Sequence, residues 1–219
     1  VTPDAQRSMF TYLGASKKLS VEDIDENIIK ASKITYIEAY LWDEDCDKEA
    51  IVKAAEIAHS YNRDVAFSLS DKSCVDRHRE EFLNFIKNHV DILFGNEDEI
   101  KSLFAEEDFY KTLDMIKPHI VHFDFPAVTR GAKGSVVVNG RTKIYVESEK
   151  VENVVDTTGA GDLYAAGFLY GLTQGRSLGT CAMIGSIAAA EIISHYGARP
   201  EISLRGLVRN KLLSYGKRA

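Results

Sequence analysis

Residues 154–172 read VVDTTGAGDLYAAGFLYGL, with small residues and a carboxylate where an apolar run gives way to a helical pattern. Glycine at positions 159 and 161 lets backbone N–H groups turn inward without a Cβ in the way. The first turn of a helix carries unpaired amides and the positive end of the helix dipole, which favour an anion. The stretch therefore predicts a helix start that binds phosphate.

Asp162 lies at that same helix start. Its carboxylate suits a base that takes the proton from a hydroxyl attacking phosphorus, while the amides stabilise the transferred phosphoryl group. The alternative is an ordinary strand-to-helix turn over 159–161, with Asp162 capping the helix. The sequence has no GxxxxGK[ST] pattern, so this is not a Walker loop.

Composition points to an ordinary globular protein that acts on small molecules. The 219 residues are 45% hydrophobic, enough for one large α/β domain or two small ones. The net charge of −6 is spread over mixed-sign helix surfaces without a basic stripe. Nucleic acid and anionic membranes are therefore disfavoured as partners.

The cysteines and the N-terminus bear on location. Cys46, Cys74 and Cys181 are odd in number and show no CxxC spacing, which argues against a disulfide framework or structural zinc and for a reducing cytoplasm. The longest apolar run, 181–194, is too short for a bilayer span and contains Glu191, so it predicts a buried helix. The N-terminus lacks a signal peptide and an initiating Met, and we expect a chain that begins partway through a fold.

Alternating elements predict a parallel sheet covered by helices. The expected helices are 21–31, 48–61 and 76–89, and the expected strands are 34–37, 65–69 and 92–94. Ser20 and Asp23 form a capping-box pattern before the first helix. HIVHF (119–123) and PAVTRGAKGSVVVNGRTKIYVE (126–147) then predict short strands, with a hairpin turn at Asn139-Gly140 and an antiparallel edge.

Three further helices are expected at 162–173, 178–195 and 204–213. No linker, repeat or low-complexity tract marks a boundary, so residues 1–219 are predicted to form a single domain.

The motif DTTGAGD (156–162) resembles the C-terminal signature of the ribokinase-like (PfkB) family of carbohydrate and purine kinases. ILFGNEDEI, AVTRGAKGSVVV and SIAAAEIISHYGARP resemble further family segments, in the family's order. VTPDAQRSMFTYLGAS, YIEAYLWD and SDKSCVDRHREEF are most similar to the bacterial adenosine kinase-like branch. The resemblance covers essentially the whole chain.

The resemblance implies a three-layer α/β/α fold with a mainly parallel sheet and an antiparallel C-terminal edge. It also implies that the N-terminal strands, the lid and the sugar-binding segment of the family are missing here. The missing strands would leave an exposed sheet edge and an apolar surface that a second copy could cover in a homodimer.

The resemblance assigns roles to the signature residues. Asp162 matches the catalytic base, which also contacts the substrate hydroxyl, and Gly159, Ala160 and Gly161 match the anion hole.

Asn96 and Glu99 match the family's NxxE pair, which helps to place Mg²⁺ and the ATP phosphates through water. Their i, i+3 spacing fits one helix face after a strand. From the sequence alone, an Asn96 N-cap with Glu99 as its capping-box partner is equally consistent, and both readings can hold together.

Other matches concern nucleotide, substrate and cation. Thr129, Gly131 and Gly134 match the family's TxGxxG turn at the nucleotide, although an ordinary hairpin turn would explain them too. Arg7 matches an arginine that reaches the substrate or the transferred phosphate. Without the resemblance, Arg7 would be interpreted as an ordinary surface side chain. Asp156 and Thr158, with the loop around residue 198, correspond to a monovalent-cation site for K⁺ in some members. Thr158 is also assigned to nucleotide binding.

The sequence thus predicts an ATP- and Mg²⁺-dependent kinase that converts adenosine to AMP in purine salvage. The alternatives are a sugar kinase of the same family, similar to ribokinase or fructokinase, or a noncatalytic nucleotide-binding fragment. We expect these 219 residues alone to be inactive, because the acceptor pocket would be incomplete.

Overall fold

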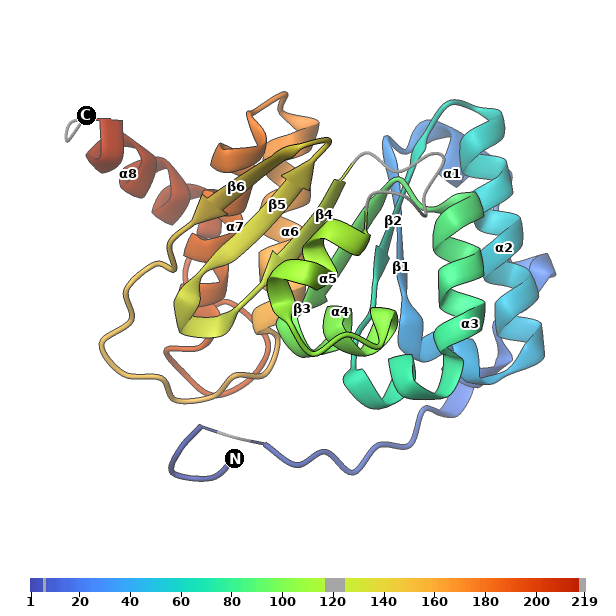
Figure 1. The fold of residues 1–219 in the computed structure, drawn as a ribbon, viewed down its shortest axis with the longest axis horizontal. Helices are drawn as coiled ribbons and strands as arrows, with labels where there is room; N and C mark the ends of the chain where they lie inside the picture. Colours follow the sequence, from blue (N-terminus) through green and yellow to red (C-terminus); the bar gives the residue numbers. More distant parts are fainter. Residues whose placement is uncertain (6, 117–124, 217–219) are drawn as a thin grey trace. The chain divides into compact units, whose positions relative to one another are not determined.

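The protein is described by a computed structural model over residues 1–5, 7–116 and 125–216 (Figure 1). Within these residues the fold is three-layer α/β, with six strands hydrogen-bonded in the order β1-β2-β3-β4-β5-β6. The sheet is mostly parallel, and β4 to β6 are antiparallel, which confirms the predicted fold class. The strands are β1 (Ile34–Glu38), β2 (Asp64–Ser68), β3 (Ile92–Asn96), β4 (Phe125–Thr129), β5 (Ser135–Asn139) and β6 (Thr142–Val146).

The chain divides into two compact units, which are described separately. Unit 1 comprises Val1–Phe10, Thr129–Val137 and Ile144–Ala219, and unit 2 comprises Thr11–Val128 and Val138–Lys143.

Unit 2 contains the parallel strands β1, β2 and β3, joined by helical crossovers. Ile34 pairs with Asp64 and Ala66 pairs with Ile92, so the carboxyl ends of these strands share one edge. Helices α2 and α3 run side by side along the strands (Figure 1). The helices of this unit are α1 (Glu26–Ala31), α2 (Asp45–Ser60), α3 (Lys72–His89), α4 (Glu97–Phe104) and α5 (Phe109–Met115), with 3₁₀ turns η1 (Gly14–Lys18), η2 (Val21–Asp23) and η3 (Ala39–Asp43).

An aromatic cluster forms part of the core of unit 2. Trp42, on η3, lies 4.9 Å from Phe85 and 5.6 Å from Phe82 between ring centroids, and both of those rings come from α3. Phe67 of β2 completes the cluster, 5.4 Å from Phe82. The Trp42 indole N–H donates to Glu81 over 2.9 Å, so its one polar atom is satisfied despite burial. The cluster packs η3 and α3 against the sheet.

Three predicted helices of unit 2 differ in extent. Helix α2 runs from Asp45 to Ser60, where 48–61 was expected. The helix expected at 21–31 is instead η2 followed by α1, because Asp25 accepts from the Asn27 amide and starts a new helix. The Ser20–Asp23 capping box is confirmed, although it caps the 3₁₀ turn. Helix α3 begins earlier than expected, since Asp71 caps it through the Ser73 amide. The strand expected at 119–123 lies outside the described residues.

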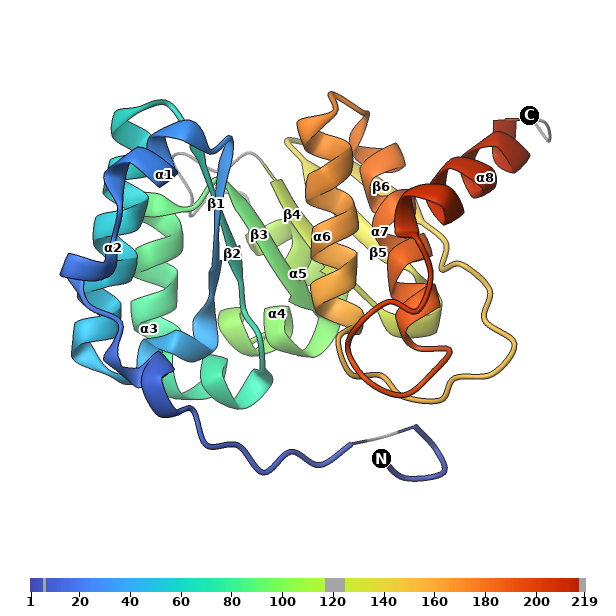
Figure 2. The ribbon, with the colours of Figure 1, turned by 180° about the vertical axis from the view of Figure 1, so that it is seen from behind.

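Unit 1 is built on the helices α6 (Ala160–Thr173), α7 (Leu178–Ile192) and α8 (Leu204–Gly216), with the 3₁₀ turn η5 (Gly131–Lys133). Helices α6 and α7 pack side by side through small residues (Figure 2). A Cβ on Gly167 would lie 2.9 Å from the Gly185 Cα, and one on Gly171 would lie 3.0 Å from the Cys181 Sγ. A methyl group at either position would force the neighbouring atoms of α7 to shift.

Several boundaries in the second half of the chain also shift. Helix α6 begins at Ala160 instead of 162, and α8 ends at Gly216 instead of 213. The loop between β5 and β6 consists of Gly140 and Arg141, one position later than predicted, with Gly140 at φ +56°. Helix α7 ends at Ile192, where 195 was expected. No helix within the described ranges is long and apolar enough to cross a membrane.

Candidate active site

Helix α6 starts inside the DTTGAGD motif, as predicted. Gly159 is the N-cap, with φ +81°, a left-handed conformation that strains any residue with a Cβ. A Cβ there would also lie 3.2 Å from that of Ala198. Gly161 has no such restriction, and a Cβ built on it meets nothing within 4 Å. The first glycine is required by the backbone, whereas the second leaves open space at the helix start.

The amides at this helix start are largely free. The N–H of Ala160 donates to the Thr157 carbonyl. The N–H groups of Gly159, Gly161 and Asp162 have no acceptor among the residues that the structure describes. Three unpaired donors at the positive end of a helix form an anion-binding arrangement.

The Asp162 side chain is exposed in the first turn of α6 and makes no hydrogen bond to any described residue. The N-cap is Gly159, which has no side chain to accept the orphan amides. In this structure Asp162 therefore does not cap the helix, and its carboxylate is open to solvent. Its role as a base is not tested and stays a prediction.

Asp156 holds the loop before α6 together. Its Oδ1 accepts from the Thr158 amide over 2.9 Å and from the Thr158 hydroxyl over 2.6 Å, and its Oδ2 accepts from the Gly197 amide over 3.0 Å. The Thr158 hydroxyl, followed by the two amides, lowers the pKa of Asp156 to about 2. Both carboxylate oxygens are occupied by the loop itself, and the monovalent-cation role of Asp156 and Thr158 stays a prediction.

Arg7 lies near the same loop. Its Nη1 donates to the Thr157 hydroxyl over 3.4 Å, a long hydrogen bond, and that hydroxyl donates to the Ala5 carbonyl over 3.2 Å. Arg7 is otherwise exposed. Its guanidinium stands near Asp156 and adds to the lowering of that residue's pKa.

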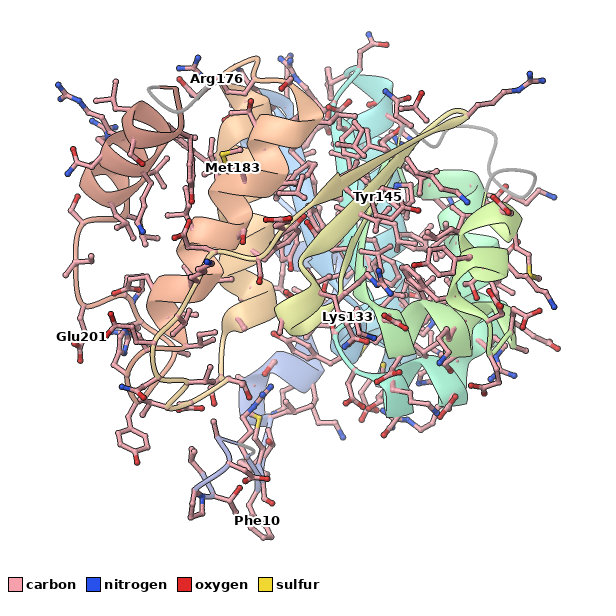
Figure 3. All side chains as sticks on the ribbon, turned by 60° about the vertical axis from the view of Figure 1, so that its left-hand side comes forward. Phe10, Lys133, Tyr145, Arg176, Met183 and Glu201 are labelled. Atoms are coloured by element: carbon pink, nitrogen blue, oxygen red, sulfur yellow. The ribbon has the colours of Figure 1, made fainter. Side chains whose placement is uncertain are left out.

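The TxGxxG residues form a tight turn in unit 1. Thr129 ends β4, Gly131 begins η5 with φ +56°, and Gly134 follows with φ +82°. A Cβ on Gly134 would lie 2.0 Å from the Val146 carbonyl oxygen. Gly134 is thus required by close backbone contact, whereas Gly131 faces open space. Figure 3 shows Lys133 on this turn.

Asn96 and Glu99 form the capping box of α4 in unit 2. The Asn96 side chain accepts from the Glu99 amide over 2.9 Å. The Glu99 carboxylate accepts from the Asn96 amide over 2.8 Å and from its Nδ2 over 2.6 Å. The capping alternative is therefore confirmed.

Glu99 is buried among other acidic groups. The pKa of Glu99 is raised to about 7, mainly because the carboxyl is buried. The hydrogen bond from the Asn96 backbone amide lowers this pKa, whereas the nearby carboxylates of Asp71 and Glu38 raise it. Asp71 follows β2 and Glu38 ends β1, so three parallel strands bring these groups to one edge. Sequence reasoning missed Glu38 and Asp71, because nothing local relates residues so far apart in the chain.

No group of three His, Cys, Asp or Glu side chains suited to a metal ion exists within residues 1–5, 7–116 and 125–216. Both Glu99 oxygens are engaged by Asn96, so direct coordination of Mg²⁺ would compete with the capping box. Each carboxylate oxygen accepts more than one hydrogen bond, and Mg²⁺ usually keeps several waters. The pair therefore fits a Mg²⁺ ion held through water.

Residues 1–204 match the pfkB family carbohydrate kinases, and the chain belongs to this family. The predicted resemblance is thereby confirmed. The structure is similar to that of adenosine kinase from Sinorhizobium meliloti, with a TM-score of 0.93 and 46% identity, covering 96% of this chain and 64% of that chain. It is equally similar to a probable sugar kinase from Rhizobium etli CFN 42, with a TM-score of 0.93 and 45% identity, covering 97% of this chain and 64% of that one.

Among curated proteins, a 5-dehydro-2-deoxygluconokinase from Listeria monocytogenes is 26% identical over 185 residues. The match covers 82% of this chain and 56% of the relative. The chain thus spans little more than half the length of this relative.

Proposed function

We propose that these residues form the nucleotide-binding and catalytic part of an ATP- and Mg²⁺-dependent phosphotransferase acting on a ribosyl hydroxyl, with adenosine as the acceptor. The observation that carries the proposal is the start of α6, where an exposed Asp162 stands beside amides that, like its own carboxylate, have no partner among the described residues. A carboxylate that serves no structural contact next to an anion-binding helix start is what a phosphoryl-transfer base requires.

In the proposed reaction, the acceptor oxygen attacks the γ-phosphorus of ATP, and the bond from that phosphorus to the ADP oxygen breaks. Asp162 takes the proton of the acceptor hydroxyl. The amides of Gly159, Gly161 and Asp162 stabilise the negative charge of the transferred group. Arg7 is proposed to reach the substrate or the transferred phosphate.

The nucleotide side is assigned to the other motif residues. Thr129, Gly131 and Gly134 are proposed to contact ATP from their turn, and Thr158 from the loop before α6. Asn96 and Glu99 are proposed to hold Mg²⁺ through water. The ion would neutralise phosphate charge. A K⁺ ion near Asp156, a homodimer and a cytoplasmic location belong to the same proposal.

The acceptor rests on similarity alone. The likeness to the Sinorhizobium adenosine kinase supports adenosine, and purine salvage with it. The nearly equal likeness to the probable sugar kinase from Rhizobium supports a sugar acceptor instead, and sugar kinase is therefore the second candidate.

The test is a coupled assay for ADP release with adenosine, ribose and fructose. It is run on the 219 residues and on the complete open reading frame that encodes them. The complete product is expected to prefer adenosine, and the 219 residues are expected to bind ATP weakly and transfer little phosphate. A preference for a free sugar would reject adenosine as the acceptor, but would leave the proposed kinase activity standing.

Asp162→Asn separates catalysis from capping. It is expected to keep ATP affinity within a few-fold and to lower kcat by about 10²- to 10⁴-fold, the usual contribution of a positioned base. Asp108→Asn is the matched control, because Asp108 does cap a helix, α5. Near-normal turnover by the Asp162 variant would reject the proposal that Asp162 acts as the catalytic base.

A further inference from the structure

Glu191 is a buried carboxylate on α7 that the proposed reaction does not use. Its side chain is only 6% exposed. Its Oε1 accepts from the Glu201 amide over 3.0 Å and faces the His195 Nε2 at 3.3 Å. Its Oε2 has no hydrogen-bond partner among the described residues. A carboxylate is costly to bury, so one retained in an apolar helix calls for a compensating role.

His195 completes the contact from the loop that follows α7. Its Nε2 faces Glu191 and its Nδ1 faces the Tyr196 carbonyl oxygen at 3.3 Å, so both ring nitrogens meet acceptors. That geometry fits an imidazolium, in which both nitrogens donate. Burial by itself lowers the pKa of His195, but the Tyr196 carbonyl and the nearby carboxylates outweigh burial and raise it. Glu201, labelled in Figure 3, lies on the same loop, with its carboxylate 3.9 Å from Nδ1.

One oxygen of Glu191 thus contacts both ends of the loop 195–201. The middle of that loop contacts the motif before α6. The Gly197 amide donates to the Asp156 Oδ2, and Ala198 packs against Gly159 so closely that a Cβ on the glycine would lie 3.2 Å from its own. The loop therefore supports Asp156 and Gly159, the two residues that shape the turn before the free amides of α6.

We propose that Glu191 is a positioning residue, which fixes the loop 195–201 at both ends so that Gly197 and Ala198 hold Asp156 and Gly159 in the phosphate-binding arrangement. This inference rests on the proposed function, because the arrangement it supports is the one that ATP phosphates would meet. Glu191 itself touches neither phosphate nor acceptor and acts through the loop.

Two substitutions separate the position of the Glu191 Oε1 atom from the negative charge of the Glu191 carboxylate. Glu191→Gln keeps an oxygen at the Oε1 position and places its amide nitrogen where the unpartnered Oε2 lies. Glu191→Asp keeps the charge but withdraws the carboxylate from the loop by one methylene. If the reach of the oxygen fixes the loop, the Gln variant retains the arrangement and the Asp variant loses it.

Amide hydrogen exchange at Gly197 reads the loop directly, because that N–H donates to Asp156. Exchange is expected to be at least about tenfold faster in Glu191→Asp, because the loop loses its contact with the carboxylate, and within about threefold of wild type in Glu191→Gln. A tenfold change in exchange corresponds to about 1.4 kcal/mol in the free energy of opening the loop. The Ile187 amide inside α7 reports global unfolding. Lys211→Met is the matched control, because Lys211 pairs with Glu149 over 2.8 Å in the same unit, and neither residue belongs to the loop 195–201.

ATP affinity, measured by calorimetry on the same variants, gives the functional readout. The dissociation constant is expected to rise at least about fivefold in Glu191→Asp and to stay near wild type in Glu191→Gln. Unchanged Gly197 exchange in Glu191→Asp, or equal acceleration in the Lys211 control, would overturn the positioning role. A wild-type chain that binds no ATP would instead reject the proposed function, whereas the Gly197 exchange would still decide whether Glu191 fixes the loop.

Discussion

Replacing Glu99 by Gln is expected to change how the stability of unit 2 depends on pH. Burial raises the pKa of Glu99 from 4.5 to about 7. In the unfolded chain the carboxyl titrates near its ordinary value, so between pH 4.5 and 7 the folded state binds the proton more tightly. The contribution of Glu99 to stability is therefore greatest below pH 4.5 and is lost as the pH rises to 7.

The size of the effect follows from the pKa. One pKa unit corresponds to about 1.4 kcal/mol, so the full change across this window is about 3 kcal/mol. Gln does not titrate, although it loses one capping hydrogen bond to Asn96 at every pH, a constant cost of about 1 to 3 kcal/mol. The wild type is thus expected to lose about 3 kcal/mol relative to Glu99→Gln between pH 4.5 and 8.

Urea unfolding monitored by Trp42 fluorescence measures this difference. Trp42 is the single tryptophan of the chain and is buried in the core of unit 2, the unit that contains Glu99. The measurements are made without Mg²⁺. Glu56→Gln is the control, because that exposed side chain on α2 is in water whether the unit is folded or not. A wild-type-minus-variant difference that is constant from pH 4.5 to 8 would refute the reasoning.

Three glycine substitutions test the backbone arguments. Gly134→Ala is expected to lower the unfolding free energy by at least about 3 kcal/mol in thermal or urea unfolding, because its Cβ would overlap the Val146 carbonyl at a positive φ; wild-type stability would show that the turn has another shape. Gly167→Ala is expected to cost about 1 to 3 kcal/mol in the same assay by forcing α6 and α7 apart, and no loss would mean that the helices pack less closely. Gly161→Ala is expected to leave the melting temperature unchanged or higher, since its Cβ meets open space, yet to weaken ATP binding in calorimetry if phosphate occupies that space; unchanged affinity would place the phosphate elsewhere.

Local sequence patterns were sufficient to predict most of the fold. Alternating apolar runs predicted β1, β2 and β3 and the helices between them, because each strand and crossover has its own periodicity. The errors are at boundaries, where a single side chain decides. Asp25 and Asp71 each start a helix at a position that the apolar pattern did not mark.

The candidate site divides in the same way. The helix start at Gly159 and the Asn96–Glu99 capping box depend on residues close in sequence, and both were predictable. The contact from Gly197 to Asp156 joins residues 41 positions apart, and the acidic edge at Glu38 depends on strand order. No local pattern encodes which loops meet, so these features required the structure.

The glycine contact between α6 and α7 bears on how the chain tolerates change over evolutionary time. Gly167 and Gly185 leave no room for even a methyl group, so neither position has a neutral substitution available. Helix α6 can then neither slide nor rotate on α7, and its N-terminus stays where the contact puts it. Drift in the surrounding side chains would leave the packing of α6 on α7 in place, since this contact is made by two residues that have no side chain to vary.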